Sequence, residues 1–128
     1  MRTLLKRPAS VAVTALFVAA GFALAATPAA ADGPHLSVYT TNEGGMANFN
    51  PDDELTNACD HKTDGLRAVA ILTYNSTTVE IHDATGDDGV CVLKDLDIAE
   101  GTKVTLTACL RDGADGANRY CRSKSGTA

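Results

Sequence analysis

The stretch LDIAEGTKVTLTAC, residues 96–109, combines a turn with a strongly patterned strand. Apolar residues alternate before a Gly-Thr turn and recur after it at every second position, at Val104, Leu106 and Ala108. A period of two is typical of a β-strand with one buried and one exposed face. The pattern predicts a strand over residues 102–112 whose apolar side points into a core.

Segments of the same kind follow one another along the chain, separated by turns rich in Gly, Pro, Asn and Asp. The segment LRAVAILTYN, residues 66–75, is apolar on both faces, as expected for a central strand that is covered on both sides. In residues 77–83, Val79 and Ile81 alternate with polar neighbours and should point inward. The predicted strands are residues 36–42, with 46–50 as a continuation, 54–60, 66–75, 77–83, 90–98, 102–112 and 119–124.

About seven strands in about a hundred residues predict an all-β fold, an immunoglobulin-like sandwich of antiparallel strands. Residues 96–109 resemble the corner between strands E and F of fibronectin type III domains, although Val104 stands where that family usually has an aromatic residue. The resemblance implies that residues 54–60 are strand B, 67–74 strand C and 90–98 strand E. The last two predicted segments are then strands F and G.

Residues 1–31 have the pattern of a secretory signal peptide. Three basic residues precede an apolar run, and an Ala-x-Ala site at residues 29–31 predicts cleavage before Asp32. The predicted secreted domain, residues 32–128, has 97 residues and a net charge of −8, against −5 for the whole chain. No later apolar segment has the length of a membrane span. A secreted location is expected, and binding to nucleic acid or to acidic membranes is disfavoured by the negative charge.

Four cysteines in a short secreted domain predict two disulfides, and the lack of any Cys-x-x-Cys spacing disfavours a zinc site. A five-residue loop over residues 113–117 would place Leu110 opposite Tyr120, both inward, and Cys109 opposite Cys121 on the outer face. This register predicts the bridge Cys109–Cys121.

The second bridge is then Cys59–Cys91, which joins the end of strand B to the start of strand E. These two strands are neighbours in the fold that the fibronectin resemblance implies. The alternative bridge, Cys59–Cys109 across the sandwich, requires an inward Cys109 and usually an adjacent tryptophan, and the chain contains no Trp. Each bridge should contribute roughly 3 kcal/mol to stability.

The last hairpin carries half of the basic residues of the predicted domain: Arg111, Arg119, Arg122 and Lys124. The predicted register places Arg111 opposite Arg119, and two adjacent guanidinium groups could bind a carboxylate or phosphate. We therefore treat Arg111, Arg119 and Arg122 as candidate ligand-binding residues. The alternative is that nearby aspartates neutralise them, or that the charges protect an edge strand from aggregation.

Two polar segments contain residue types that could bind a metal. In HDATGDDG, residues 82–89, the carboxylates of Asp83, Asp87 and Asp88 are the oxygen ligands that calcium prefers, but their spacing differs from that of an EF-hand. DHKTDG, residues 60–65, has the Asp-Gly signal of a turn. A polar loop and a turn are the favoured interpretations, and no metal or other cofactor is predicted.

Two resemblances bear on function. The segments DGPHLSVYTT, DGLRAVAILTY and LDIAEGTKVTLTACLRDGA resemble a family of small secreted actinomycete proteins, a likeness that assigns no activity or site residue. The architecture is also similar to that of two-disulfide amylase inhibitors, but the cysteine spacing differs and their Trp-Arg-Tyr recognition segment is missing.

No nucleophile or metalloprotease signature is present, so an enzyme is disfavoured. The sequence predicts a secreted, non-enzymatic binding module for an extracellular protein or a cell-envelope glycan, either free outside the cell or associated with the cell wall. The alternative function is a proteinaceous inhibitor of a secreted hydrolase.

Overall fold

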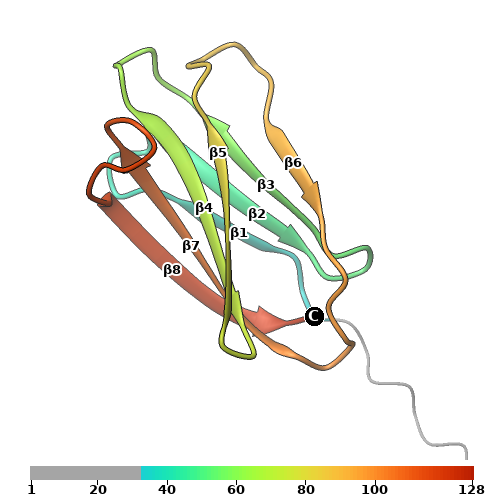
Figure 1. The fold of residues 1–128 in the computed structure, drawn as a ribbon. Coiled ribbons are helices and arrows are strands. Elements are labelled where there is room, and N and C mark those ends of the chain that lie inside the picture. The colour runs from blue at the N-terminus through green and yellow to red at the C-terminus, as the bar shows by residue number, and fades with distance from the viewer. Residues whose placement is uncertain (1–32) are drawn as a thin grey trace, which may run out of the picture.

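The computed structural model describes residues 33–128, so the predicted signal peptide and its cleavage site lie outside the described residues (Figure 1). This part of the chain forms eight strands: β1 (Leu36–Tyr39), β2 (Gly45–Asn50), β3 (Leu55–Asp60), β4 (Arg67–Tyr74), β5 (Thr77–Asp83), β6 (Val92–Asp95), β7 (Lys103–Arg111) and β8 (Arg119–Thr127). Within it, no helix has the length and apolar character needed to cross a membrane.

The strands form two four-stranded sheets, with the orders β1-β2-β3-β6 and β5-β4-β7-β8, in which all neighbours are antiparallel. The sheets pack face to face, as Figure 1 shows. The prediction of an all-β sandwich with two disulfides is therefore confirmed.

The core lies between the sheets and follows the predicted alternation. Val104 and Leu106 of β7 are buried, and so are Leu72 of β4, Ile81 of β5 and Phe49 of β2. Strand β4 pairs with β5 on one side and with β7 on the other, as predicted for a central strand. The predicted cover on both faces is only partial, because on the outer face Val69 is buried but Thr73 is exposed.

The first two strands are separate, so the prediction that residues 46–50 continue the first strand is wrong. A turn after β1 reverses the chain: Thr40 N–H donates to the Gly45 carbonyl at 2.9 Å. The Asn42 side chain holds this turn by accepting from Thr40 Oγ1 at 2.9 Å and from Gly44 N at 3.0 Å. An asparagine that bonds nearby backbone in this way favours a turn over an extended strand.

Both predicted disulfides are present, Cys59–Cys91 and Cys109–Cys121. The predicted β7–β8 register holds from Lys103–Thr127 to Ala108–Arg122, and a β-bulge then shifts it by one residue. Tyr120 is the extra residue, with a φ of 55° and a side chain that is 48% exposed.

The bulge overturns two details of the predicted hairpin. Leu110 pairs with Arg119, so the predicted inward pair of Leu110 with Tyr120 and the predicted opposition of Arg111 to Arg119 are both wrong. The physical reason is that the Tyr120 carbonyl turns out of the ladder and accepts from Thr41 N–H at 2.9 Å.

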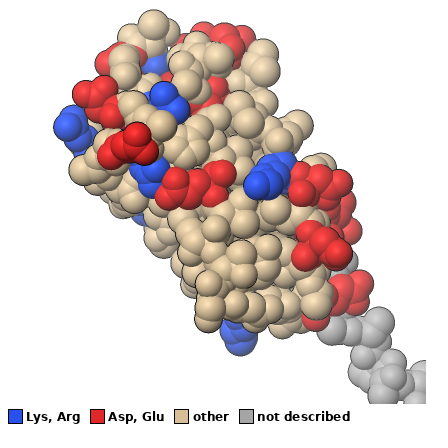
Figure 2. Space-filling model, in the orientation of Figure 1, with Lys and Arg blue, Asp and Glu red and all other residues tan. Residues whose placement is uncertain are grey.

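One end of the sandwich is acidic. The connections β2–β3 and β6–β7 meet there, and Figure 2 shows acidic side chains gathered at this end. Its carboxylates are Asp52, Asp53, Glu54, Asp95, Asp97 and Glu100. We call this group the acidic end.

Candidate functional site

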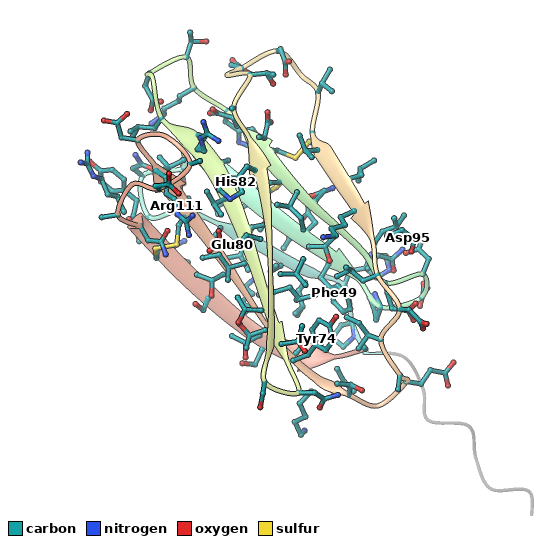
Figure 3. The ribbon with its side chains drawn as sticks, in the orientation of Figure 1. Phe49, Tyr74, Glu80, His82, Asp95 and Arg111 are labelled. Atoms are coloured by element: carbon teal, nitrogen blue, oxygen red, sulfur yellow. A yellow bond between two sulfur atoms is a disulfide. The ribbon has the colours of Figure 1, made fainter. Side chains whose placement is uncertain are left out.

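Arg111, predicted as a ligand-binding residue, is instead held by the chain itself. Its residue is 8% exposed, and its guanidinium makes a forked ion pair with Glu80 of β5. Nη1 donates to Glu80 Oε2 at 2.8 Å and Nη2 to Oε1 at 2.6 Å. Because β4 lies between β5 and β7, the Arg111 side chain spans β4 on the outer face of the sheet (Figure 3).

Further contacts complete this arrangement, which we call the arginine clamp: Arg111, Glu80, His82 and Asn118. Arg111 Nε donates to Asn118 Oδ1, and Nη1 also donates to the Ala114 carbonyl at 3.1 Å. His82 Nε2 lies 3.2 Å from Glu80 Oε2. The clamp therefore ties the β7–β8 loop to β5.

The charges of the clamp stabilise one another. The hydrogen bond from Arg111 holds the pKa of Glu80 below its usual value, and the same bond raises the pKa of Arg111. Val69 and Cys109 lie on this outer face and are each 1% exposed. Four of the five guanidinium N–H groups are occupied, so the clamp is a structural device rather than an open anion site.

The other predicted basic residues are free. Arg119, Arg122 and Lys124 of β8 are exposed and make no ion pair within the described part of the chain. Arg122 and Lys124 stand opposite Ala108 and Leu106, whose side chains point inward. Inward-pointing charges on an edge strand oppose edge-to-edge pairing, which favours the edge-protection interpretation for these two residues.

The aspartates considered as weak calcium candidates have separate roles. Asp83 is fully buried and accepts from Asp60 N at 2.8 Å, Thr85 N at 3.2 Å and Thr85 Oγ1 at 2.7 Å. Asp88 Oδ1 accepts from Val90 N at 2.9 Å in the loop. Across residues 33–128, no group of three or more His, Cys, Asp or Glu side chains is arranged to hold a metal ion.

Asp83 also explains why β6 is shorter than the predicted strand over residues 90–98. If the β3–β6 ladder continued, the Asp60 N–H would donate to the segment before Val92. It donates to the Asp83 carboxylate instead. The segment before Val92 is thereby released from the sheet. The neighbouring turn over residues 60–65 is confirmed, with a φ of 78° at Gly65.

Asp60 is a buried carboxylate with one unsatisfied oxygen. It is 3% exposed, its Oδ1 accepts from Lys62 N at 3.1 Å, and its Oδ2 is buried without a hydrogen-bond partner. Burial raises the pKa of Asp60, and the nearby charges of Asp64 and Asp83 raise it further. The ionised form therefore destabilises the folded protein.

Asp60→Asn is expected to raise the free energy of unfolding at neutral pH by about 1 kcal/mol, because it removes a buried charge and keeps an acceptor for Lys62 N–H. The folded state retains the Asp60 proton at a pH where the unfolded chain has released it. Wild-type stability should therefore fall as the pH rises from 3.8 through the folded pKa, and the variant should lack this fall. Urea unfolding across this pH range tests it, with the exposed Asp87→Asn as control; an advantage that persists unchanged below pH 3.8 would contradict the linkage.

A groove on the outer face of the β1-β2-β3-β6 sheet is the best candidate site. Its volume is about 440 Å³, and the side chains that reach it lie in two rows across the sheet. We call it the amide groove, and its lining side chains are His35, Ser37, Asn48, Asn50, Leu55, Asn57 and Leu93. The sequence alone does not show this groove, because Asn57 joins Asn48 and Asn50 on one face only in the observed β2–β3 register.

The centre of the amide groove is an asparagine pair. Asn48 Nδ2 donates to Asn57 Oδ1 at 2.9 Å, which leaves Asn48 Oδ1 and Asn57 Nδ2 for a ligand. Leu93 lies beside Asn57 across the ladder and is 62% exposed. At one end of the groove, His35 Nε2 lies 3.5 Å from Asp52 Oδ2.

No family model, curated protein or solved structure matches the chain. The amide groove combines uncharged donors and acceptors with an exposed leucine, and its only titratable lining side chain is His35. Such a surface can hydrogen-bond hydroxyl or amide groups and pack against C–H groups of a neutral ligand.

A second hollow, of about 400 Å³, lies among the loops at the end opposite to the acidic end. It is lined in part by Lys62, Arg67 and Asp112, so that both charge signs are present. Lys62 Nζ already donates to the Asn42 carbonyl at 2.9 Å. This hollow is built from loops, whereas the amide groove lies on paired strands.

Proposed function

We propose that this chain is a secreted, non-enzymatic binding module that holds a neutral cell-envelope glycan in the amide groove. The observation that carries the proposal is the Asn48–Asn57 pair, which presents one free acceptor and free donors beside the exposed Leu93. A sugar hydroxyl both donates and accepts, and a sugar ring has C–H faces that pack on apolar side chains. The groove supplies both kinds of contact on a rigid sheet.

A location outside the cell and an immunoglobulin-like identity are part of the same proposal. Two disulfides and no free cysteine in the described part of the chain are consistent with an extracellular protein. The neighbours β3–β6 and β4–β7–β8 correspond to strands B–E and C–F–G of the predicted fold, which supports the immunoglobulin-like assignment.

The double variant Asn48→Ala/Asn57→Ala should bind the glycan about 30-fold more weakly, because two hydrogen bonds of about 1 kcal/mol each are lost. Binding is measured by co-sedimentation of the disulfide-bonded protein with purified cell walls, with a chito-oligosaccharide as soluble competitor. The matched control is Thr105→Ala/Ser125→Ala, which removes a hydrogen-bonded pair at 3.2 Å from the outer face of the other sheet. Equal binding by both variants and wild type would place any glycan site elsewhere.

A hydrolase inhibitor is the second candidate function, favoured by the Tyr120 bulge. A bulky residue with a φ of 55° is strained, and such residues cluster at functional sites. Tyr120 is also exposed and is flanked by the free charges of Arg119 and Arg122. Stoichiometric retention of one enzyme from culture fluid, lost in Tyr120→Gly, would favour the inhibitor over the glycan module.

A further inference from the structure

β6 is an edge strand whose second side is unpaired. It pairs with β3 alone, and in Figure 1 no described strand lies beyond it. All four of its residues are exposed. An unpaired strand edge presents a row of backbone N–H and C=O groups that can pair with another chain.

The free backbone groups of β6 can be assigned from the ladder. Leu96 N–H donates to the Glu54 carbonyl at 3.3 Å, and hydrogen-bonded pairs alternate along an antiparallel ladder. Lys94 and Val92 therefore bond to β3. The N–H and C=O groups of Leu93 and Asp95 point away from β3, toward the free edge.

The side chains around this edge are apolar and unusually exposed. Of the five large apolar side chains that are exposed in the described residues, three lie on or just before β6: Val90 (64%), Val92 (39%) and Leu93 (62%). Val92 stands opposite the buried Ala58, so it faces the other sheet and is still uncovered. A strand added beside β6 would cover these side chains.

The acidic residues on both sides of this edge favour an added strand of opposite charge. Asp87 and Asp88 precede β6, Asp95 is its last residue, and Asp97 of the acidic end follows it. The one cation of β6, Lys94, points toward the other sheet, opposite Thr56. A second copy of this acidic chain would bring like charges together, whereas a peptide with basic ends would meet opposite charges.

We propose that the free edge of β6 binds an extended segment of a partner protein by β-strand addition, with apolar residues opposite Leu93 and basic residues at both ends. Because β6 is short and carries Lys94, pairing with arbitrary strands is disfavoured. The affinity for the partner segment therefore depends on its basic ends. This proposal uses the backbone of β6 and does not require the amide groove to bind a glycan.

The test uses the peptide KKVTVTVKK, capped at both ends, on the disulfide-bonded protein at low salt. Its addition should slow hydrogen exchange at the Leu93 and Asp95 amides at least tenfold and leave Val92 and Lys94, which are already paired with β3, unchanged. The peptides EEVTVTVEE and KKVTPTVKK should have no effect, because the first repels the flanking aspartates and the second lacks a central donor. Slowing by all three peptides, or by none, would overturn the proposal.

Two variants of Leu93 distinguish the contribution of its backbone N–H to peptide binding from that of its side chain. Leu93→Pro removes only an outward N–H, so the β3–β6 ladder is kept and peptide binding should be lost. Leu93→Ala keeps the N–H and should bind the peptide within about fivefold of wild type. Equal peptide binding by both variants would overturn the proposal, as would a dimer of the free protein in sedimentation that protects the same amides. Binding of the same two variants to purified cell walls tests the amide groove in a separate experiment.

Discussion

The Cys59→Ala/Cys91→Ala variant should lose about 4 kcal/mol of the free energy of unfolding, the larger of the two disulfide effects. The bridge joins residues 32 apart in the sequence, and the loop-closure entropy that it removes from the unfolded chain grows with this separation. The loss is a large share of the about 5–15 kcal/mol that holds a small domain folded. Urea unfolding of the oxidised wild type and the variant measures it.

The position of this bridge gives a second reason for a large effect. Cys91 directly precedes β6, which has only four paired residues and no buried side chain. Without the bridge, the loop after β5 and β6 itself are held mainly by that short ladder. Hydrogen exchange at the Lys94 amide should therefore speed up more than exchange at Leu106 in the core of the other sheet.

The control is Cys109→Ala/Cys121→Ala, whose bridge spans 12 residues and should cost about 3 kcal/mol. It closes a hairpin that the β7–β8 ladder already holds on both sides of the bulge. If removal of this bridge proved the more costly of the two, native-state packing around Cys109 would outweigh the entropy of the unfolded chain.

The strands could be predicted because their signals are local. Alternation in β5 and β7 follows from which side chains face the core, and the observed strands, β4 included, agree with the predicted segments. The bridge Cys109–Cys121 followed from the same alternation and a five-residue loop. The bulge at Tyr120 could not be predicted, because it depends on a hydrogen bond from Thr41, which is far away in the sequence.

The candidate sites depend on long-range pairing, which one sequence does not reveal. Glu80 and Arg111 are 31 residues apart, and nothing local marks Glu80 as the partner of an arginine that looked free. Asn48 and Asn57 become neighbours only through the β2–β3 register, and the registers of β1–β2 and β3–β6 add the rest of the amide groove. Sequence patterns therefore placed the charges in the correct strands but gave no sign of the ion pair that holds Arg111.

Arg111→Met should lower the free energy of unfolding by about 3 kcal/mol. Met fills much of the same space across β4, but Glu80 and Asn118 lose their charged donor, and breaking an ion pair whose arginine end is buried leaves an uncompensated group. The value is at the low end of the range for buried pairs because the Glu80 side chain is 36% exposed. Arg111→Lys keeps the charge but not the fork and should fall between wild type and Arg111→Met.

The pH dependence of the free energy of unfolding distinguishes the contribution of the ion pair from that of packing. Because the pKa of Glu80 is lowered below 4.5, its contribution is complete above that pH and is lost as the pH falls through the folded pKa. Arg111→Met should remove this acid loss, and Arg111→Met/Glu80→Gln should be no less stable than Arg111→Met alone, since Gln leaves no unpaired charge. If both variants kept the wild-type acid profile, packing over Val69, rather than the ion pair, would be what Arg111 supplies.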